Sequence, residues 1–198
     1  MSRARRHSIG PQQAFTNNLS AGAAVGAAAY VVNYVLMYLF VTIDGADAGP
    51  FETWNFAGNI LYNAQFVSTE YNGGGRIETI NFVTESSSND LLAAYIDTDI
   101  GSTIPTLVYH IVPIVVLLVA GVIAAKRMGS RLDTQSAAAA GATVMPGVLV
   151  LSVLGIFLFE ESDSGITVAP ELAMGVLLVG VVIPLILGAI GGAISNEL

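Results

Sequence analysis

His110 is the ionisable residue with the most distinctive position, because it lies in a long apolar stretch beside Tyr109 and three residues before Pro113. An ionisable side chain inside a membrane span is a candidate site by default. A neutral imidazole can bind a metal, and its protonation near neutral pH can act as a switch. The structural alternative, which we favour, is a neutral ring hydrogen-bonded to Asn33, Tyr34 or the carbonyl that the proline leaves free. We expect these residues to form a polar site within the membrane.

The sequence predicts no catalytic residues, no cofactor and no metal site. His7 is the other histidine, there is no cysteine, and no His-x3-His spacing is present. A nucleophile, a base and an orienting group therefore cannot be assembled on one side of a membrane. The glycine run at 73–75 lacks the lysine and hydroxyl residue of a phosphate-binding loop. An enzyme is accordingly not predicted.

The composition of the chain is that of a multi-pass membrane protein. Of 198 residues, 54% are hydrophobic and 11% are charged, and the mean hydropathy is +0.68. Soluble domains carry about 25% charged residues. A chain this apolar is not disordered, and without cysteine it is not a disulfide scaffold.

Four stretches are long enough to cross a hydrocarbon core, which takes about 20 helical residues. We predict an all-α membrane protein, a four-helix transmembrane bundle with a small α+β extracellular cap between the first two spans. The spans are 19–43, 104–125, 136–159 and 169–194. They separate a cytoplasmic tail (1–18), the cap (44–103), a cytoplasmic loop (126–135), an extracellular turn (160–168) and a cytoplasmic end (195–198).

The charges predict the orientation of the spans. Six of the seven basic residues lie in the tail or in the 126–135 loop, namely Arg3, Arg5, Arg6, Lys126, Arg127 and Arg131. Arg76 alone lies on the other side, among many acids. By the positive-inside rule, both termini are cytoplasmic and the protein sits in the cell membrane. The competing interpretation, a cleaved signal peptide, fits poorly because the first apolar run is longer than 7 to 15 residues.

The net charge of -8 is typical of a halophilic source, because concentrated salt screens repulsion between acidic groups. A cation-collecting vestibule is the alternative. Nucleic acid is not a predicted partner, since the positive-inside rule already explains the two basic clusters.

Small residues gather at the cytoplasmic end of all four spans and bulky ones at the outer end. Close helix contacts in lipid favour small residues spaced by four positions. Gly22 with Gly26, and Gly188 with Gly192, form two such pairs, and we predict that these two faces meet. The outer half must then splay into a wedge, which the cap, lipid or a partner would fill.

The cap has the pattern of a small folded unit. Residues 50–64 have apolar spacing typical of an amphipathic helix, 65–71 and 76–84 flank a turn and predict a hairpin, and 91–96 predict a short helix. Exposed hairpin edges pair readily with other chains. We therefore predict an interaction surface at Trp54, Tyr62, Asn63, Phe66 and Phe82.

Three segments of the cap resemble a family of uncharacterised haloarchaeal four-span membrane proteins. They are Phe-Glu-Thr-Trp-Asn at 51–55, Leu-Tyr-Asn-Ala-Gln-Phe-Val at 61–67 and Ile-Asn-Phe-Val at 80–83. This chain has Gln65 where the family pattern has histidine. Some members carry only the label "transporter", so the resemblance implies a halophilic membrane protein but no substrate and no functional residues.

Two functions remain open at this point. The first is a non-catalytic membrane protein, in contact with lipid, whose cap mediates self-assembly or association with a partner membrane protein or a larger envelope complex. The alternative is a small-solute or ion transporter or channel with His110 near its pathway. A continuous polar route is normally required for conduction, and the spans contain few polar residues.

Overall fold

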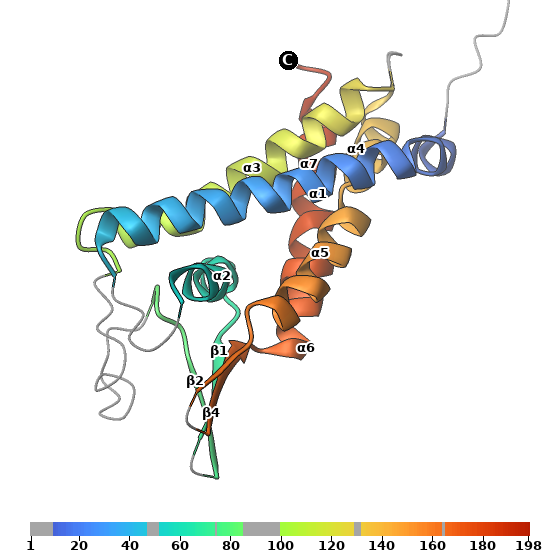
Figure 1. Ribbon diagram of the computed structural model, residues 1–198. Helices are drawn as coiled ribbons and strands as arrows, with labels where there is room; N and C mark the ends of the chain where they lie inside the picture. Colours follow the sequence, from blue (N-terminus) through green and yellow to red (C-terminus); the bar gives the residue numbers. More distant parts are fainter. Residues whose placement is uncertain (1–9, 47–51, 74, 85–99, 129–131, 164) are drawn as a thin grey trace, which may run out of the picture.

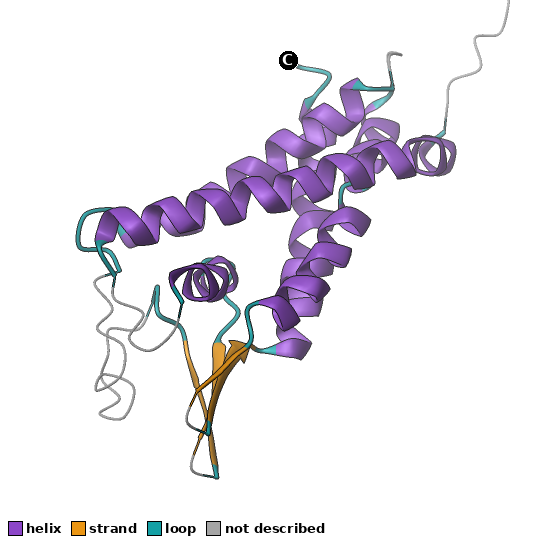
Figure 2. Cartoon of the chain, in the orientation of Figure 1, coloured by secondary structure: helices purple, strands orange, loops and turns teal. Residues whose placement is uncertain are grey.

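The computed structural model describes residues 10–46, 52–73, 75–84, 100–128, 132–163 and 165–198 (Figure 1). It is mostly helical, with a small antiparallel sheet at one end (Figure 2). The expected helix at 91–96, and His7 and Pro50, lie outside the described residues. The same applies to Arg3, Arg5, Arg6 and Arg131.

Four helical stretches are long and apolar enough to cross a membrane, as predicted. They are α1 (Pro11–Asp44), α3 (Thr106–Lys126), the Thr134–Leu158 stretch and the Leu172–Ile194 stretch. Helix α1 has 34 residues, so it is about 51 Å long. The helix begins with Pro11, whose ring favours the first helical position. The residue that caps its C-terminal end, Gly45, has the left-handed conformation (φ 70°).

Proline divides the third and fourth stretches into shorter helices. The third consists of α4 (Thr134–Ala142) and α5 (Met145–Leu158), with Pro146 at the start of α5. The fourth consists of α6 (Leu172–Met174), the π-helix η1 (Gly175–Val182) and α7 (Ile183–Ile194), where Pro184 lies in the first turn. A proline has no N–H for the preceding turn, so the α4–α5 and η1–α7 breaks lie where the backbone ladder loses a donor.

The sheet differs from the prediction, because two loops build it. The expected hairpin is present as β1 (Thr69–Gly73) and β2 (Arg76–Ile80). The segment predicted as a plain turn, 160–168, forms a second hairpin, β3 (Glu161–Asp163) and β4 (Ile166–Pro170). Strand β4 pairs antiparallel with β1, which gives the order β2-β1-β4-β3. The sheet is therefore not confined to the segment between the first two long helices.

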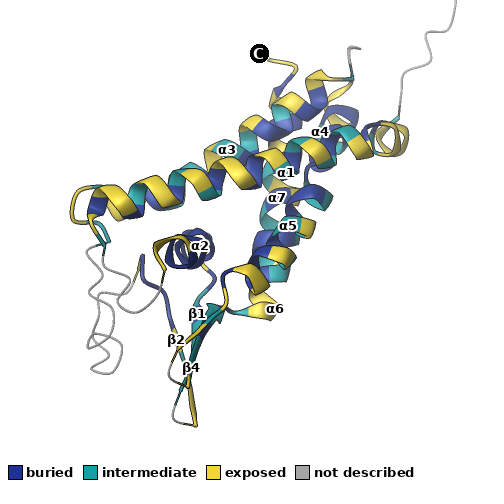
Figure 3. Cartoon of the chain, viewed as in Figure 1, coloured by how far each residue is buried: buried dark blue, intermediate teal, exposed yellow. Residues whose placement is uncertain are grey.

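The helices form two arms that are close together near the C-terminus and diverge toward the sheet (Figure 1). Helices α1 and α3 form one arm, and α5 and η1 form the other, while α7 packs mainly against α3 and α4 where the arms meet. Helix α2 (Thr53–Asn63) lies between the diverging ends, where the sequence predicts a wedge. Residues 55–65 are all buried there (Figure 3).

Two apolar clusters follow this shape. A cluster of small residues, mainly Ala14, Ala125, Ala137 and Ala140, lies at the narrow end. The larger cluster surrounds α2 and contains big side chains such as Tyr62, Met37 and Leu61. The gradient in side-chain size along the spans therefore corresponds to the divergence of the arms.

Candidate functional site

A ladder of asparagines on α2 connects the helix to its surroundings. Asn55, Asn59 and Asn63 are four residues apart, so they lie on one face of the helix. Asn59 Nδ2 donates to the Phe159 carbonyl at 3.2 Å, and Asn63 Nδ2 donates to Thr69 Oγ1 at 3.0 Å. The ladder thus joins α2 to the end of α5 and to β1.

Asn63 also holds the segment that follows β2. Its Oδ1 accepts from the Phe82 N–H at 2.9 Å, and its backbone carbonyl accepts from Asn81 Nδ2 at 3.1 Å. A buried amide that loses such partners leaves unsatisfied groups, which is costly. The ladder is therefore a structural network inside the wedge.

Glu161 of β3 caps the N-terminal end of α2. Its carboxylate accepts from the Glu52 N–H at 3.1 Å and from Asn55 Nδ2 at 2.7 Å. An acidic group at this end is favoured by the helix dipole and by the unpaired N–H groups of the first turn. The second hairpin therefore helps to fix α2, a role that the sequence pattern does not reveal.

Tyr62 connects α2 to both arms. Its hydroxyl donates to the Ser152 carbonyl at 2.5 Å and lies 3.0 Å from the Tyr30 hydroxyl. Burial raises the pKa of the Tyr62 phenol well above its ordinary value, so the group stays protonated. Gly155 makes room for this contact, because a Cβ there would lie 2.1 Å from the Tyr30 hydroxyl.

His110 contacts the end of α2. Its Nδ1 lies 2.8 Å from the Ala64 carbonyl oxygen, so Nδ1 carries the proton and donates. The ring stacks on Phe66 with centroids 4.7 Å apart and planes 4° apart. Phe66 has φ +64°, in the left-handed region that is uncommon for a bulky residue, and its side chain is 62% exposed.

A cavity of about 230 Å³ lies beside His110. Residues 64–66 form one end, His110, Pro113 and Ile114 of α3 form one wall, and four aliphatic side chains between Val182 and Leu187 form the other. The lining is almost entirely apolar. His110, a residue of the predicted polar site, is part of this lining.

The other residues of the predicted polar site lie elsewhere. Tyr109 donates to Asp44 Oδ2 at 2.8 Å, and Tyr34 donates to the Trp54 carbonyl at 3.2 Å. Asn33 is buried, and its Oδ1 has no partner among the described residues. No hydrogen bond joins His110, Tyr109, Asn33 and Tyr34 to one another within the described part of the chain.

Asp44, the last residue of α1, is buried. Its carboxylate accepts from the backbone N–H groups of Gly101, Thr103 and Ile104 at 2.7 to 2.9 Å. With Tyr109 it thus has four donors. The carboxylate at the end of α1 fixes the entry of the chain into α3.

The two glycine pairs do not face each other, which corrects the predicted contact. A Cβ at Gly22 would meet Thr143, and one at Gly26 would meet the Val144 carbonyl. A Cβ at Gly188 would meet Val144 and Gly141, and one at Gly192 would meet the Ala137 carbonyl. Both pairs therefore pack against α4 and its junction with α5, because the small residues of α4 also permit close approach.

Asn18 closes the narrow end of the arms. Its Nδ2 donates to the carbonyls of Ala124 and Ala140 at 2.9 and 3.2 Å, and it lies 3.2 Å from Thr143 Oγ1. One buried amide thus joins α1, α3 and α4.

The predicted interaction surface is partly wrong. Trp54 and Phe66 are exposed, at 38% and 62%. Tyr62, Asn63 and Phe82 are buried, because α2 packs on every side in the wedge instead of lying on a surface. These three residues belong to the core.

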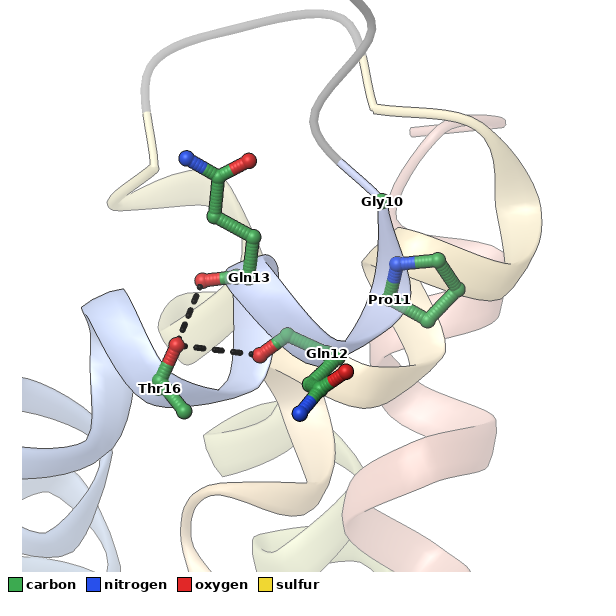
Figure 4. A pocket seen from close by; sticks show the side chains of 5 residues that line it. All are labelled: Gly10, Pro11, Gln12, Gln13 and Thr16. Carbon is green, nitrogen blue, oxygen red and sulfur yellow. Dashed lines mark hydrogen bonds between the residues drawn. The ribbon is translucent and has the colours of Figure 1, made fainter.

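A second hollow lies at the start of α1, lined by Gly10, Pro11, Gln12, Gln13 and Thr16 (Figure 4). The Thr16 hydroxyl bonds to carbonyls of the same helical turn. The hollow is an open depression on one turn of helix. Among the described residues, no three His, Asp or Glu side chains group as metal ligands do.

Comparisons with known proteins place the chain in a family. No curated protein and no solved structure matches it. The family of unknown function DUF7978 matches residues 1–198, the whole chain. The protein therefore belongs to this family of unknown function.

Proposed function

We propose that this protein is a non-catalytic, multi-pass membrane protein whose outer sheet mediates assembly with another chain. The four long helices cross the membrane with both termini in the cytoplasm. The start of α1 and the C-terminus lie at the end opposite the sheet, in agreement with that orientation (Figure 1). Lys126 is the last residue of α3 and Arg127 is its C-cap, so two basic groups lie at the proposed cytoplasmic end of this helix.

The observation that carries the proposal is the edge of β2 that faces away from β1, on which no described strand lies. The sheet order leaves β2 and β3 with one described neighbour each. Strand β3 has three residues and β2 has five, so β2 is the longer template for an added strand.

The register identifies the groups that a partner strand would meet. Gly73 and Arg76 flank the turn and face each other, so they form a hydrogen-bonded pair, as does Tyr71 with Glu78. Ile77 and Thr79 alternate with these hydrogen-bonded residues along β2. Their backbone N–H and C=O groups therefore point away from β1. The Ile77 side chain is 66% exposed, which adds an apolar contact at this edge.

Charged groups beside Ile77 make pairing at this edge selective. Arg76 and Glu78 flank it in the strand, and Arg76 forms no ion pair with a described residue. A partner strand that places opposite charges across from them is favoured, and one with like charges is disfavoured. The edge is therefore suited to a specific partner.

The proposal is tested by the size of the native assembly. Membranes containing tagged protein are solubilised in mild detergent, and the complex is sized on a native gel. Ile77→Pro removes an outward N–H while an edge strand tolerates proline, so the assembly should fall apart. Ile77→Val keeps the N–H and should leave it intact. Wild-type protein that runs as a monomer, or an unchanged assembly in Ile77→Pro, would overturn the proposal.

Transport of a small solute lacks a comparable observation. The asparagine ladder bonds to neighbouring groups within the wedge, and the cavity beside His110 has an apolar lining. Assembly through β2 is therefore the function that we propose.

A further inference from the structure

The cavity beside His110 opens onto the surface that the proposed membrane arrangement places in lipid. Ile111 and Ile114 of α3 are 44% and 39% exposed, and Ile186 of α7 is 52% exposed. All three belong to helices of spanning length and composition. Hydrocarbon is the material next to such a surface, because a spanning helix presents its exposed side chains to lipid tails.

The wall formed by residues 182–187 lies at an irregular part of its helix. The π-helix η1 ends at Val182, and Pro184 follows in the first turn of α7. Single π-type turns in helices are frequent at functional sites. The π-helix meets the cavity at its last residue, Val182, so the irregular segment ends at the cavity wall.

Phe66 holds an unusual conformation at the end of the cavity. Its backbone is left-handed although it is not glycine, and its ring is exposed yet stacked on His110. Such a conformation costs of order 1 kcal/mol or more, and these outliers gather at ligand sites. The two stacked rings form a flat wall at this end.

His110, which lines the cavity, also carries a second ring nitrogen. Because Nδ1 donates to the Ala64 carbonyl, the neutral ring carries a lone pair on Nε2. No described residue hydrogen-bonds to Nε2. A hydroxyl group can donate a hydrogen bond to this nitrogen.

We propose that this cavity binds one membrane lipid. Its hydrocarbon chain lies against the aliphatic side chains of residues 182–187, and a hydroxyl of its head group donates to His110 Nε2. The inference rests on the proposed membrane orientation but not on assembly through β2.

The test compares two probes that differ by one hydrogen-bond donor. Purified full-length protein in detergent is titrated with 1,2-dioleoylglycerol and with its 3-O-methyl ether, and bound lipid is counted by native mass spectrometry. One hydrogen bond corresponds to a difference of about two- to tenfold in affinity. Wild-type protein should prefer the free alcohol by that factor. Equal binding of the two probes, or no retained lipid, would overturn the proposal.

Variants locate the site. Ile183→Trp fills the cavity and should abolish binding of both probes, whereas Val119→Trp, on an exposed part of α3 that does not line the cavity, should not. His110→Phe keeps an aromatic ring against Phe66 but removes Nε2, so the chain should still bind while the preference for the alcohol disappears. Unchanged binding in Ile183→Trp would contradict the assignment of the cavity.

Two controls separate a folding defect from loss of the site. Each variant is checked for the wild-type helical circular dichroism signal and melting temperature. If Ile183→Trp fails that check, Ile186→Phe replaces it as a smaller filling change with the same expected loss. Ile77→Pro should bind lipid as the wild type does, so failure of the assembly proposal and failure of this one give different results.

Discussion

Tyr109 and Asp44 are joined across 65 positions of sequence, with the phenol donating to Asp44 Oδ2 at 2.8 Å. This contact fixes the end of α1 to the first turns of α3. The same carboxylate accepts three backbone N–H groups from residues 101–104. The two helices of this arm are thus connected at their outer ends by one side chain.

Asp44→Asn should destabilise the protein strongly. The amide nitrogen cannot accept, so at least one buried donor loses its partner and the charge-assisted bonds are weakened. We expect a loss of about 2 kcal/mol or more in unfolding free energy. The measurement is denaturant unfolding in detergent, with Asp163→Asn at an exposed position as control. Equal stability of the two variants would contradict the role of Asp44.

Gly155→Ala should destabilise the contact between α2 and the arms, and Tyr30→Phe should relieve part of the effect. The added methyl group would lie 2.1 Å from the Tyr30 hydroxyl oxygen, which the second change removes. Overpacking of this kind costs about 1 to 3 kcal/mol. Melting of the two single variants and the double variant gives the coupling energy, and strictly additive effects would refute a clash between these two groups.

Tyr62→Phe should reduce stability without changing the fold. It removes the bonds to Ser152 and Tyr30 and leaves their buried groups without a partner, at a cost of about 1 to 3 kcal/mol. Tyr38→Phe, at an exposed position of α1, is the matched control. A melting temperature that is the same in both variants would show that the buried phenol contributes nothing.

The sequence predicts the four long helices and the first hairpin because both depend on local patterns. Uncharged runs of spanning length are visible in any window, and the residues at 72–75 favour a turn. The wedge follows from the gradient of side-chain size. These features can be predicted because residues close together in the sequence determine them.

The rest depends on contacts between distant segments. Pairing of β1 with β4 joins residues about 100 positions apart, and Glu161 and Asp163 make the second hairpin resemble a solvated turn. The apolar stripe of α2 indicates a surface helix, yet the helix is buried, and Phe159, Thr69 and Phe82 provide hydrogen-bond partners for Asn59 and Asn63. Three of the four hydrogen-bond donors to Asp44 are backbone N–H groups, which leave no pattern in the sequence.

If the partner strand belongs to a second copy, the residues around Ile77 are self-complementary. Antiparallel pairing centred on Ile77 places Arg76 of one copy opposite Glu78 of the other, twice per dimer, and the two Ile77 side chains together. Arg76→Glu or Glu78→Arg alone should weaken the detergent-solubilised dimer about tenfold or more, by placing like charges together.

The double variant, with both charges exchanged, should restore the dimer. Sedimentation of all four proteins in one detergent measures the dissociation constants. If the double variant dimerises as weakly as the single variants, this register is excluded. If the single variants dimerise as tightly as the wild type, charge pairing between copies is excluded.

Cross-linking from the β2 edge in native membranes is the sharpest test of assembly through this strand. A photoreactive phenylalanine analogue replaces Ile77, or Ser162 on the short β3 edge as control. We expect a discrete cross-linked product from position 77, identified by mass spectrometry, and little or none from position 162. No product from position 77, or equal products from both positions, would contradict assembly through β2.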